Sequence, residues 1–289
     1  MIRRILAAAA FGALALVVPS AAPAQIEPSL EDANAPRPLA WGDFGFGAEK
    51  RDRVEYAVEG RGKGFAVLLF VDGPDALDRE RRLDLGFLPG FALDHGLLPM
   101  RIAMPRREGR TAAEQLAKLA DAVAAIGANG RKYGYDGSRI VLAGEGWGAG
   151  MAAALGTDPV WLERAGVPFG TIRGVLALDP RGLDLAADVR QAEARGRAQL
   201  ARVIGPAGDP LLYSAAAHAA APNAPHFLFE TVGGSAPAAA LAEALRSAGG
   251  AAEVASTDRT QTRMWSSYPG HATHKENARI AAFLAAAVR

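Results

Sequence analysis

The chain has 289 residues, half of them apolar, with 32 basic and 31 acidic side chains and no cysteine. A composition this apolar and this weakly charged excludes an intrinsically disordered segment, and the lack of cysteine excludes a disulfide scaffold, a thiolate nucleophile and thiolate metal sites. The net charge near zero gives no electrostatic reason to expect a nucleic-acid partner.

Residues 1–24 have the pattern of a secretory signal peptide. Arg3 and Arg4 form a basic start, Ile5–Val18 is apolar, and Ala22–Ala24 contains the small residues typical of a cleavage site. The apolar run is shorter than the roughly 20 residues that a membrane-spanning helix needs, so a retained anchor is the less favoured alternative. We expect an exported protein, periplasmic or extracellular, without a stable membrane anchor.

Residues 25–51 are rich in proline, alanine and acids, which predicts an extended lead-in lying on a domain formed by residues 52–289. Within that domain, apolar runs that alternate with helical patterns are the expected strands: Arg53–Val58, Phe65–Val71, Leu98–Met104, Arg139–Ala143, Ile172–Leu178, His226–Glu230 and Ala251–Thr257. Such alternation indicates a single-domain α/β fold, with a mainly parallel central sheet and helices on both faces.

The clearest helical pattern covers Thr111–Ala128. Thr111 and Glu114 form a predicted capping box. One face of this helix carries its large apolar residues, which are Leu116, Leu119, Ala120, Val123 and Ile126. A last helix is expected over Lys275–Val288, and Ser235 suits the role of a helix cap.

One junction between a strand and a helix stands out. After the strand Arg139–Ala143 comes Gly144-Glu145-Gly146-Trp147-Gly148, and small helical residues follow. In parallel sheets the chemistry lies beyond the carboxyl ends of the strands. A strand that enters a helix through alternating glycines has the layout of a nucleophile elbow, whose central residue is held at positive φ.

From Tyr133 to about Leu185 the chain resembles the esterase and lipase branch of the α/β-hydrolases, especially feruloyl and acetyl-xylan esterase-like carbohydrate esterases. The resemblance rests on the run Tyr133–Gly144, on the elbow and on the strand Ile172–Leu178 with Asp179 after it. It implies an α/β-hydrolase fold and a small-molecule ester or acylated-carbohydrate ligand. The catalytic pattern of the family is Gly-X-Ser-X-Gly, whereas Gly146 occupies the nucleophile position here.

Two interpretations of the elbow remain open. In the favoured one, Gly146 forms the turn without a nucleophile, because glycine adopts positive φ at little cost. In the other, Glu145 acts as a carboxylate nucleophile or base. Trp147 follows the elbow; its N–H could supply half of an oxyanion hole, while its indole is better suited to pocket packing than to substrate stacking.

The remaining elements of the family pattern are incomplete. Where the family has a His-Gly-Gly-Gly oxyanion stretch, this chain has Val71-Asp72-Gly73-Pro74, and proline lacks a backbone donor. Gly73 remains a candidate binding residue. No acid follows the strand that ends at Glu230. The candidate triad acid is Asp179, after the preceding strand, and Asp258, after the final strand, is the less favoured alternative.

The loop before the last helix supplies the candidate histidines. His271 fits the spacing of the family histidine better than His274, and Ser266 and Ser267 are candidate ligand contacts at the pocket mouth. The two histidines lack a clear acidic third ligand, so we expect no metal, and we expect no cofactor.

These observations favour an exported esterase-like protein whose serine-hydrolase activity is lost, a pseudoenzyme that binds a ligand or a partner. The alternative is an extracytoplasmic esterase that uses a rearranged constellation, such as Glu145 or Asp179 with His271. A third hypothesis is a purely interacting protein whose pocket has closed and whose partner the sequence does not specify.

Overall fold

The computed structural model describes residues 35–73, 85–103, 111–205, 208–257, 269–272 and 274–289. The chain divides into two compact units, Met1–Ala35 and Pro36–Arg289, and the fold below is that of the second. The predicted signal peptide, residues 1–24, lies outside the described residues, as do Asp258, Ser266 and Ser267.

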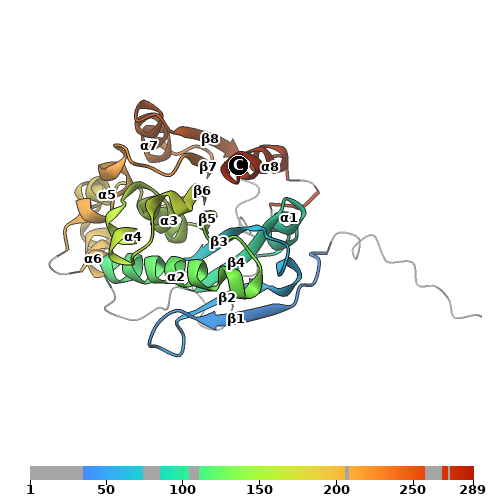
Figure 1. The fold of residues 1–289 in the computed structure, drawn as a ribbon. Helices are drawn as coiled ribbons and strands as arrows, with labels where there is room; N and C mark the ends of the chain where they lie inside the picture. Colours follow the sequence, from blue (N-terminus) through green and yellow to red (C-terminus); the bar gives the residue numbers. More distant parts are fainter. Residues whose placement is uncertain (1–34, 74–84, 104–110, 206–207, 258–268, 273) are drawn as a thin grey trace, which may run out of the picture. The chain divides into compact units, whose positions relative to one another are not determined.

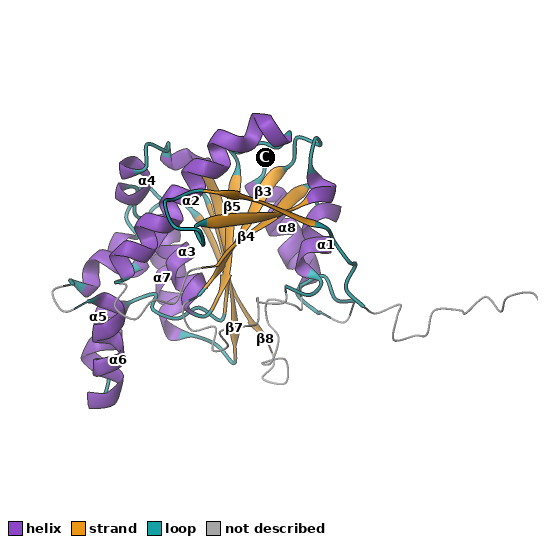
Figure 2. Cartoon of the chain, turned by 90° about the horizontal axis from the view of Figure 1, so that it is seen from below, coloured by secondary structure: helices purple, strands orange, loops and turns teal. Residues whose placement is uncertain are grey.

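A single sheet forms the centre of the second unit (Figures 1 and 2). Its strands are β1 (Trp41–Gly45), β2 (Arg53–Ala57), β3 (Ala66–Asp72), β4 (Leu97–Ala103), β5 (Ile140–Glu145), β6 (Ile172–Leu178), β7 (His226–Val232) and β8 (Ala251–Thr257). Their spatial order is β1-β2-β4-β3-β5-β6-β7-β8. The pairs β1–β2 and β2–β4 are antiparallel and all others are parallel, which confirms the predicted mainly parallel sheet.

Helices cover both faces of this sheet, as predicted. They are α1 (Leu88–Asp94), α2 (Ala112–Tyr133), α3 (Trp147–Thr157), α4 (Val160–Arg164), α5 (Leu185–Gln191), α6 (Ala194–Ile204), α7 (Ala236–Ser247) and α8 (Asn277–Ala287). On one face, Leu88 of α1 and Leu284 of α8 pack against strand residues such as Leu176. Helices α2, α3, α4 and α7 contribute to the core on the opposite face.

Helix α2 forms as its sequence predicts at the start and extends beyond the predicted end. The Thr111 hydroxyl accepts a hydrogen bond from the Glu114 N–H at 3.3 Å, and the Glu114 carboxylate accepts one from the Thr111 N–H at 2.8 Å. The helix ends at Tyr133 rather than at Ala128 because Gly134, at φ 71°, provides the left-handed cap. The predicted apolar face is buried.

The expected lead-in over residues 25–51 contains a strand that the sequence pattern did not reveal. β1 pairs with β2 along its length, and Phe44 is buried at its centre. The Phe44 ring lies 6.0 Å from that of Tyr56 and 5.8 Å from that of Tyr133. Only one residue of this short segment is buried, which leaves little hydrophobic periodicity to detect.

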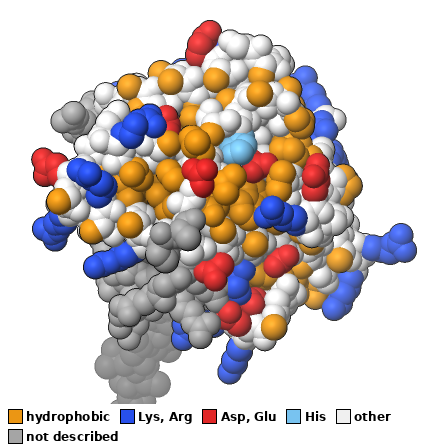
Figure 3. Space-filling model, turned by 90° about the vertical axis from the view of Figure 1, so that its left-hand side faces the viewer, with side chains coloured by type: hydrophobic (Ala, Val, Ile, Leu, Met, Phe, Trp, Pro, Cys, Tyr) orange, Lys and Arg blue, Asp and Glu red, His pale blue; other side chains and the backbone are white. Residues whose placement is uncertain are grey.

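Between β6 and β7 the chain forms α5, α6 and two short 3₁₀ helices, η4 (Pro210–Tyr213) and η5 (Ala215–His218). Figure 3 shows hydrophobic side chains gathered on the side of the molecule that carries α4, α5 and α6. Leu211 and Leu212 of η4 are each 51% exposed. No helix within the described ranges is long and apolar enough to span a membrane.

Candidate functional site

The turn between β5 and α3 has the backbone geometry expected of an elbow. Gly146 lies between the two elements with φ 56° and ψ −121°. Its N–H donates to the Leu178 carbonyl at 3.0 Å, and its carbonyl accepts hydrogen bonds from the N–H groups of Gly150 and Arg181 at 3.2 and 2.9 Å. These bonds fix the turn against β6 and the segment after it.

Two further glycines allow strand and helix to approach each other closely. A Cβ added to Gly144 would lie 2.5 Å from the carbonyl carbon of Gly148. A Cβ on Gly148 would lie 2.2 Å from the Val71 carbonyl oxygen and 3.0 Å from the Gly73 nitrogen. Gly144 and Gly148 therefore allow the close approach of strand and helix, and Gly73 lies beside the start of α3.

Glu145 is the last residue of β5 and is partly buried. Side chains alternate along a strand, so Glu145 is directed to the same face as Val141 and Ala143, which pack with α1 and α8. Trp147 instead packs with the core on the α2 and α3 face. Glu145 and Trp147, the candidate residues before and after Gly146, therefore lie on opposite faces of the sheet.

Asp179, the candidate acid, follows β6 and has φ 42°, a left-handed conformation that aspartate tolerates better than most residues. Its N–H donates to the Glu230 carbonyl at 2.7 Å, and its carboxylate accepts the Val232 N–H at 3.4 Å. Both contacts join the ends of β6 and β7. This is the geometry of a structural connection between neighbouring strands.

The loop before α8 holds the two histidines in different environments. The His271 ring meets the Phe87 ring edge-on, with centroids 4.7 Å apart. Asn277 fixes the loop: its amide donates to the His271 carbonyl at 2.7 Å, and its side-chain oxygen accepts the Gly270 N–H at 2.8 Å. His271 thus lies beside the start of α1, whereas His274 lies against β7.

His274 forms a buried pair with Glu230. Nε2 of His274 lies 3.5 Å from Oε2 of Glu230, and both side chains are fully excluded from solvent. The sequence pattern favours His271 and places the expected acid beyond Glu230, so it misses this pair. The available signal was a lone carboxylate within the apolar run of β7, since acids are almost never fully buried unless they are paired.

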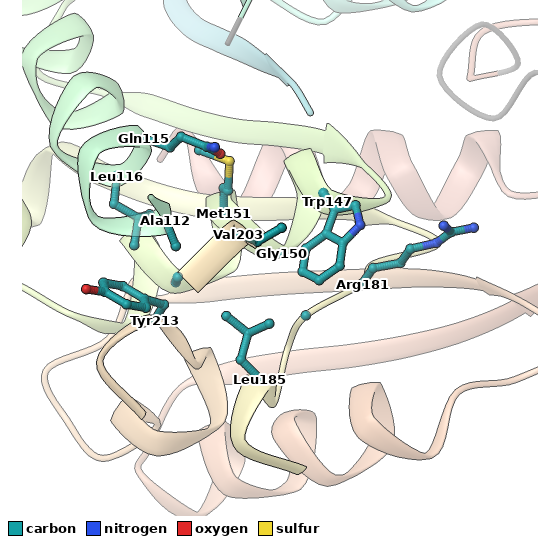
Figure 4. A pocket seen from close by; sticks show the side chains of 12 residues that line it. Ala112, Gln115, Leu116, Trp147, Gly150, Met151, Arg181, Leu185, Val203 and Tyr213 are labelled. Carbon is teal, nitrogen blue, oxygen red and sulfur yellow. The ribbon is translucent and has the colours of Figure 1, made fainter. Parts of the chain in front are cut away.

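An apolar pocket lies on the other face of the sheet, beside the elbow (Figure 4). Its cavity has a volume of about 30 Å³. The lining residues come from α2, α3, α5, α6, η4 and the turn after β6: Ala112, Gln115, Leu116, Trp147, Gly150, Met151, Ala154, Arg181, Gly182, Leu185, Val203 and Tyr213. Of the predicted binding residues, Trp147 lines this pocket, whereas Gly73 does not.

Solved structures of bacterial esterases share this architecture. Esterase B from Lactobacillus rhamnosis matches with a TM-score of 0.66 at 11% identity, over 86% of this chain and 85% of that one. Thermogutta terrifontis esterase 2 matches with a TM-score of 0.56 at 16% identity, over 75% of this chain and 81% of that one. Its butyrate-bound form matches at 0.57 and 15%, over 75% and 82%. The fold is that of an α/β-hydrolase.

The sequence itself matches no family model and no curated protein. At such low identities the structural likeness establishes the esterase-like α/β-hydrolase fold alone. In that fold the elbow carries glycine at its centre, and the pocket begins at the next residue, Trp147. The described residues include no group of three His, Asp or Glu side chains that could hold a metal ion.

Proposed function

We propose that this protein is an exported member of the esterase-like α/β-hydrolase fold that binds a small ligand and does not act as a serine esterase. The observation that carries the proposal is Gly146, which occupies the strained centre of the elbow at φ 56°. Glycine has no side chain that could attack an acyl carbon, although it forms the turn at little cost.

The pocket favours the ligand-binding hypothesis over the hypothesis of a protein that only contacts a partner and has a closed pocket. Trp147 borders unfilled apolar space, and Met151 and Leu185 are further lining residues. Concave, mostly apolar sites are typical of small-molecule binding. One structural neighbour, Thermogutta terrifontis esterase 2, has been solved with butyrate bound. Short acyl compounds and acetylated sugars are therefore the first ligands to test.

Fluorophosphonate labelling of the mature chain, combined with hydrolysis assays, tests the loss of serine chemistry. We expect neither labelling nor turnover of short p-nitrophenyl esters and an acetylated sugar, because the elbow has no hydroxyl. Peptide mapping identifies any labelled site. Specific labelling of one serine together with turnover would overturn the proposal and identify a relocated nucleophile.

Gly146→Ser tests whether the rest of the catalytic machinery is intact. Serine at this φ costs about 1–3 kcal/mol of backbone strain, and the resulting hydroxyl has no established acid and oxyanion partners, so we expect weak esterase activity at most. Gly170→Ser is the matched control, since Gly170 is exposed and a Cβ there meets open space. Rates of an ordinary esterase in Gly146→Ser would show that only the nucleophile had been lost.

The buried Glu230–His274 pair favours one alternative, a hydrolase with a rearranged constellation. Glu230, within β7, lies 3.5 Å from the imidazole of His274, and a carboxylate beside an imidazole is the pairing used for general-base catalysis. If turnover is found, His274→Gln should abolish it while thermal unfolding shows a folded protein. Intact turnover in the double variant His271→Ala, Glu145→Ala would exclude the constellation predicted from sequence.

A further inference from the structure

Four exposed cations gather at the end of the sheet opposite the elbow. They come from the turn before β3 and from the last residues of α2, and we call them the basic cluster: Arg61, Lys63, Arg131 and Lys132. The turn leads into β3 and α2 leads into β5, and these two strands are parallel neighbours. The basic cluster therefore lies at the amino ends of the strands, whereas Gly146 follows the carboxyl end of β5.

Backbone contacts hold the two basic segments side by side. The N–H of Gly62 donates to the Tyr133 carbonyl at 3.0 Å, and the N–H of Gly64 donates to the Gly134 carbonyl at 2.9 Å. A Cβ added to Gly134 would lie 2.6 Å from the Gly62 Cα, so the missing side chain allows this approach. Gly62 and Gly64 have φ values of 72° and 65°, which glycine adopts at little cost. The positions of the four cations are thus set by the fold.

The ring of Tyr133 brings two members of the basic cluster close together. Cζ of Arg61 lies 5.2 Å from the ring centroid, and Nζ of Lys132 lies 5.0 Å from it. These two charges are therefore at most about 10 Å apart. The Tyr133 ring also stacks on the buried ring of Phe44, with centroids 5.8 Å apart, which anchors it to the core.

No ion pair joins the basic cluster to an acid of the described residues. Glu59, two residues before Arg61, accepts a hydrogen bond from the Ala40 N–H at 2.9 Å. Acids of β1, β2 and the loop between them pair with other cations, in the pairs Asp43–Arg53, Asp52–Lys118 and Glu55–Arg101. The positive charge of the cluster is therefore directed to solvent.

The concentration of charge is not explained by the fold alone. The dipole of α2 favours cations at its C-terminus, which accounts for Arg131 and Lys132. Arg61 and Lys63 belong to a separate segment, and their charges add to a region that is already positive. Like charges that lie close together repel and destabilise the folded chain, whose net charge is only +1. An anionic partner would relieve this repulsion.

We propose that the basic cluster docks the protein on the surface of an anionic lipid bilayer. The turn that carries Lys63 projects from the fold, since a Cβ at Gly62 or Gly64 would meet nothing within 4 Å. A projecting turn beside a helix end presents its cations together to a flat surface, whereas an extended polymer is better held by a groove. Cations near an anionic membrane surface each strengthen binding about fivefold.

This inference is independent of the elbow and of the pocket. The pocket lies at the first turn of α2, where Ala112 and Gln115 line it, and the basic cluster lies at the other end of the helix. With 22 residues, α2 is about 33 Å long. A protein docked through the basic cluster therefore keeps its pocket away from the lipid and open to ligands in solution.

Co-sedimentation of the mature chain with lipid vesicles tests the proposal. One set of vesicles consists of equal parts of phosphatidylglycerol and phosphatidylcholine, and the other of phosphatidylcholine alone. We expect binding to the anionic vesicles only. Raising the salt concentration from about 0.05 M to about 0.5 M should release the protein, because salt screens charges that are exposed to solvent.

The double variant Arg61→Gln, Arg131→Gln should bind the anionic vesicles at least about tenfold more weakly, because it removes one cation from each segment. The matched control is Arg195→Gln, Arg202→Gln, which removes two exposed arginines of α6 and should bind like the natural sequence. All four side chains are exposed, so thermal unfolding should show that both variants are folded.

The inference fails if the protein ignores anionic vesicles at low salt, if it binds neutral vesicles equally well, or if both double variants lose the same affinity. It also fails if a soluble anionic polysaccharide, dextran sulfate, is bound while the vesicles are not, since this would indicate a polymer as the partner. Each of these outcomes leaves the proposed loss of serine chemistry intact, because that is judged by labelling.

Discussion

Gly144, Gly146 and Gly148 meet different physical requirements within one turn. Gly146 is the residue at positive φ, so its requirement is conformational. Gly144 and Gly148 have no positive φ, but the backbone of a neighbouring element occupies the position of their missing Cβ atoms. A sequence motif of alternating glycines thus combines one requirement for backbone conformation with two for close packing.

Gly148→Ala is expected to destabilise the protein by at least about 2 kcal/mol, because overpacking against backbone forces strands and helices apart. The added methyl group would lie 2.2 Å from the Val71 carbonyl oxygen. Chemical denaturation measures the free energy of unfolding. Gly170→Ala is the control, and an equal loss of stability in both variants would contradict the close-packing argument.

The buried Glu230–His274 pair shows how residue chemistry depends on its surroundings. In the sequence, Glu230 reads as the end of a strand and His274 as the second of two loop histidines. In the fold, the two side chains face each other with no exposure to solvent. Removing one partner of a buried ionisable pair is costly, which is why their variants need a folding control.

At the level of elements, β1 adds an antiparallel edge to an otherwise predictable sheet. Its attachment depends on Phe44, whose ring packs with two tyrosines from β2 and α2. The aromatic contact joins β1 and β2, which are neighbours in sequence, to α2, which is distant from both. Local sequence patterns do not report such contacts, whereas the runs of β3, β5 and β6 are recognised by their own hydrophobicity.

Phe44→Ala should lower the free energy of unfolding by about 3 kcal/mol, the usual cost of removing a buried phenylalanine. Urea denaturation of the purified protein measures it. Val58→Ala serves as the control because Val58 is 38% exposed, and its effect should stay within about 0.5 kcal/mol. A similarly small effect at Phe44 would mean that β1 contributes little to the stability of the sheet.

At the scale of the molecule, Asp136 connects segments from three regions of the chain. Its N–H donates to the Phe65 carbonyl at 2.8 Å, and its carboxylate accepts the Arg139 Nε–H at 2.6 Å. Arg139 in turn donates to the Val288 carbonyl at 2.7 Å, beyond the end of α8. Partial burial raises the pKa of Asp136, but hydrogen bonds from Ser138 and Arg139 outweigh burial and hold this pKa below its ordinary value.

Asp136→Asn should therefore reduce stability at neutral pH, by about 1 kcal/mol for the weakened hydrogen bonds. Because the pKa is lowered by folding, the contribution of the carboxylate is complete above the ordinary pKa of 3.8 and is lost as pH falls through the lower folded value. The free energy of unfolding should be measured from pH 7 to below pH 3.8. The difference in stability between Asp136→Asn and the natural sequence should disappear as the pH falls.

Asp188→Asn is the control, because the pKa of Asp188 is raised in the folded protein whereas that of Asp136 is lowered. Burial, and secondarily the charge of Asp184, raises the pKa of the Asp188 carboxyl. Folding therefore opposes ionisation of this group, and the variant should be no less stable than the natural sequence at neutral pH. A parallel loss of stability in both variants would contradict the assignment of Asp136 to a stabilising network.

The sequence alone indicated the seven strands β2–β8 and their alternation with helices, the start of α2 and the elbow with its central glycine, because these depend on local periodicity, capping and conformational preference. Only the tertiary structure decided which acid meets which histidine and that β1 joins the sheet. The Glu230–His274 contact joins residues far apart in the chain, and β1 reaches the sheet through a segment with a single buried residue, so neither is encoded by local hydrophobic periodicity.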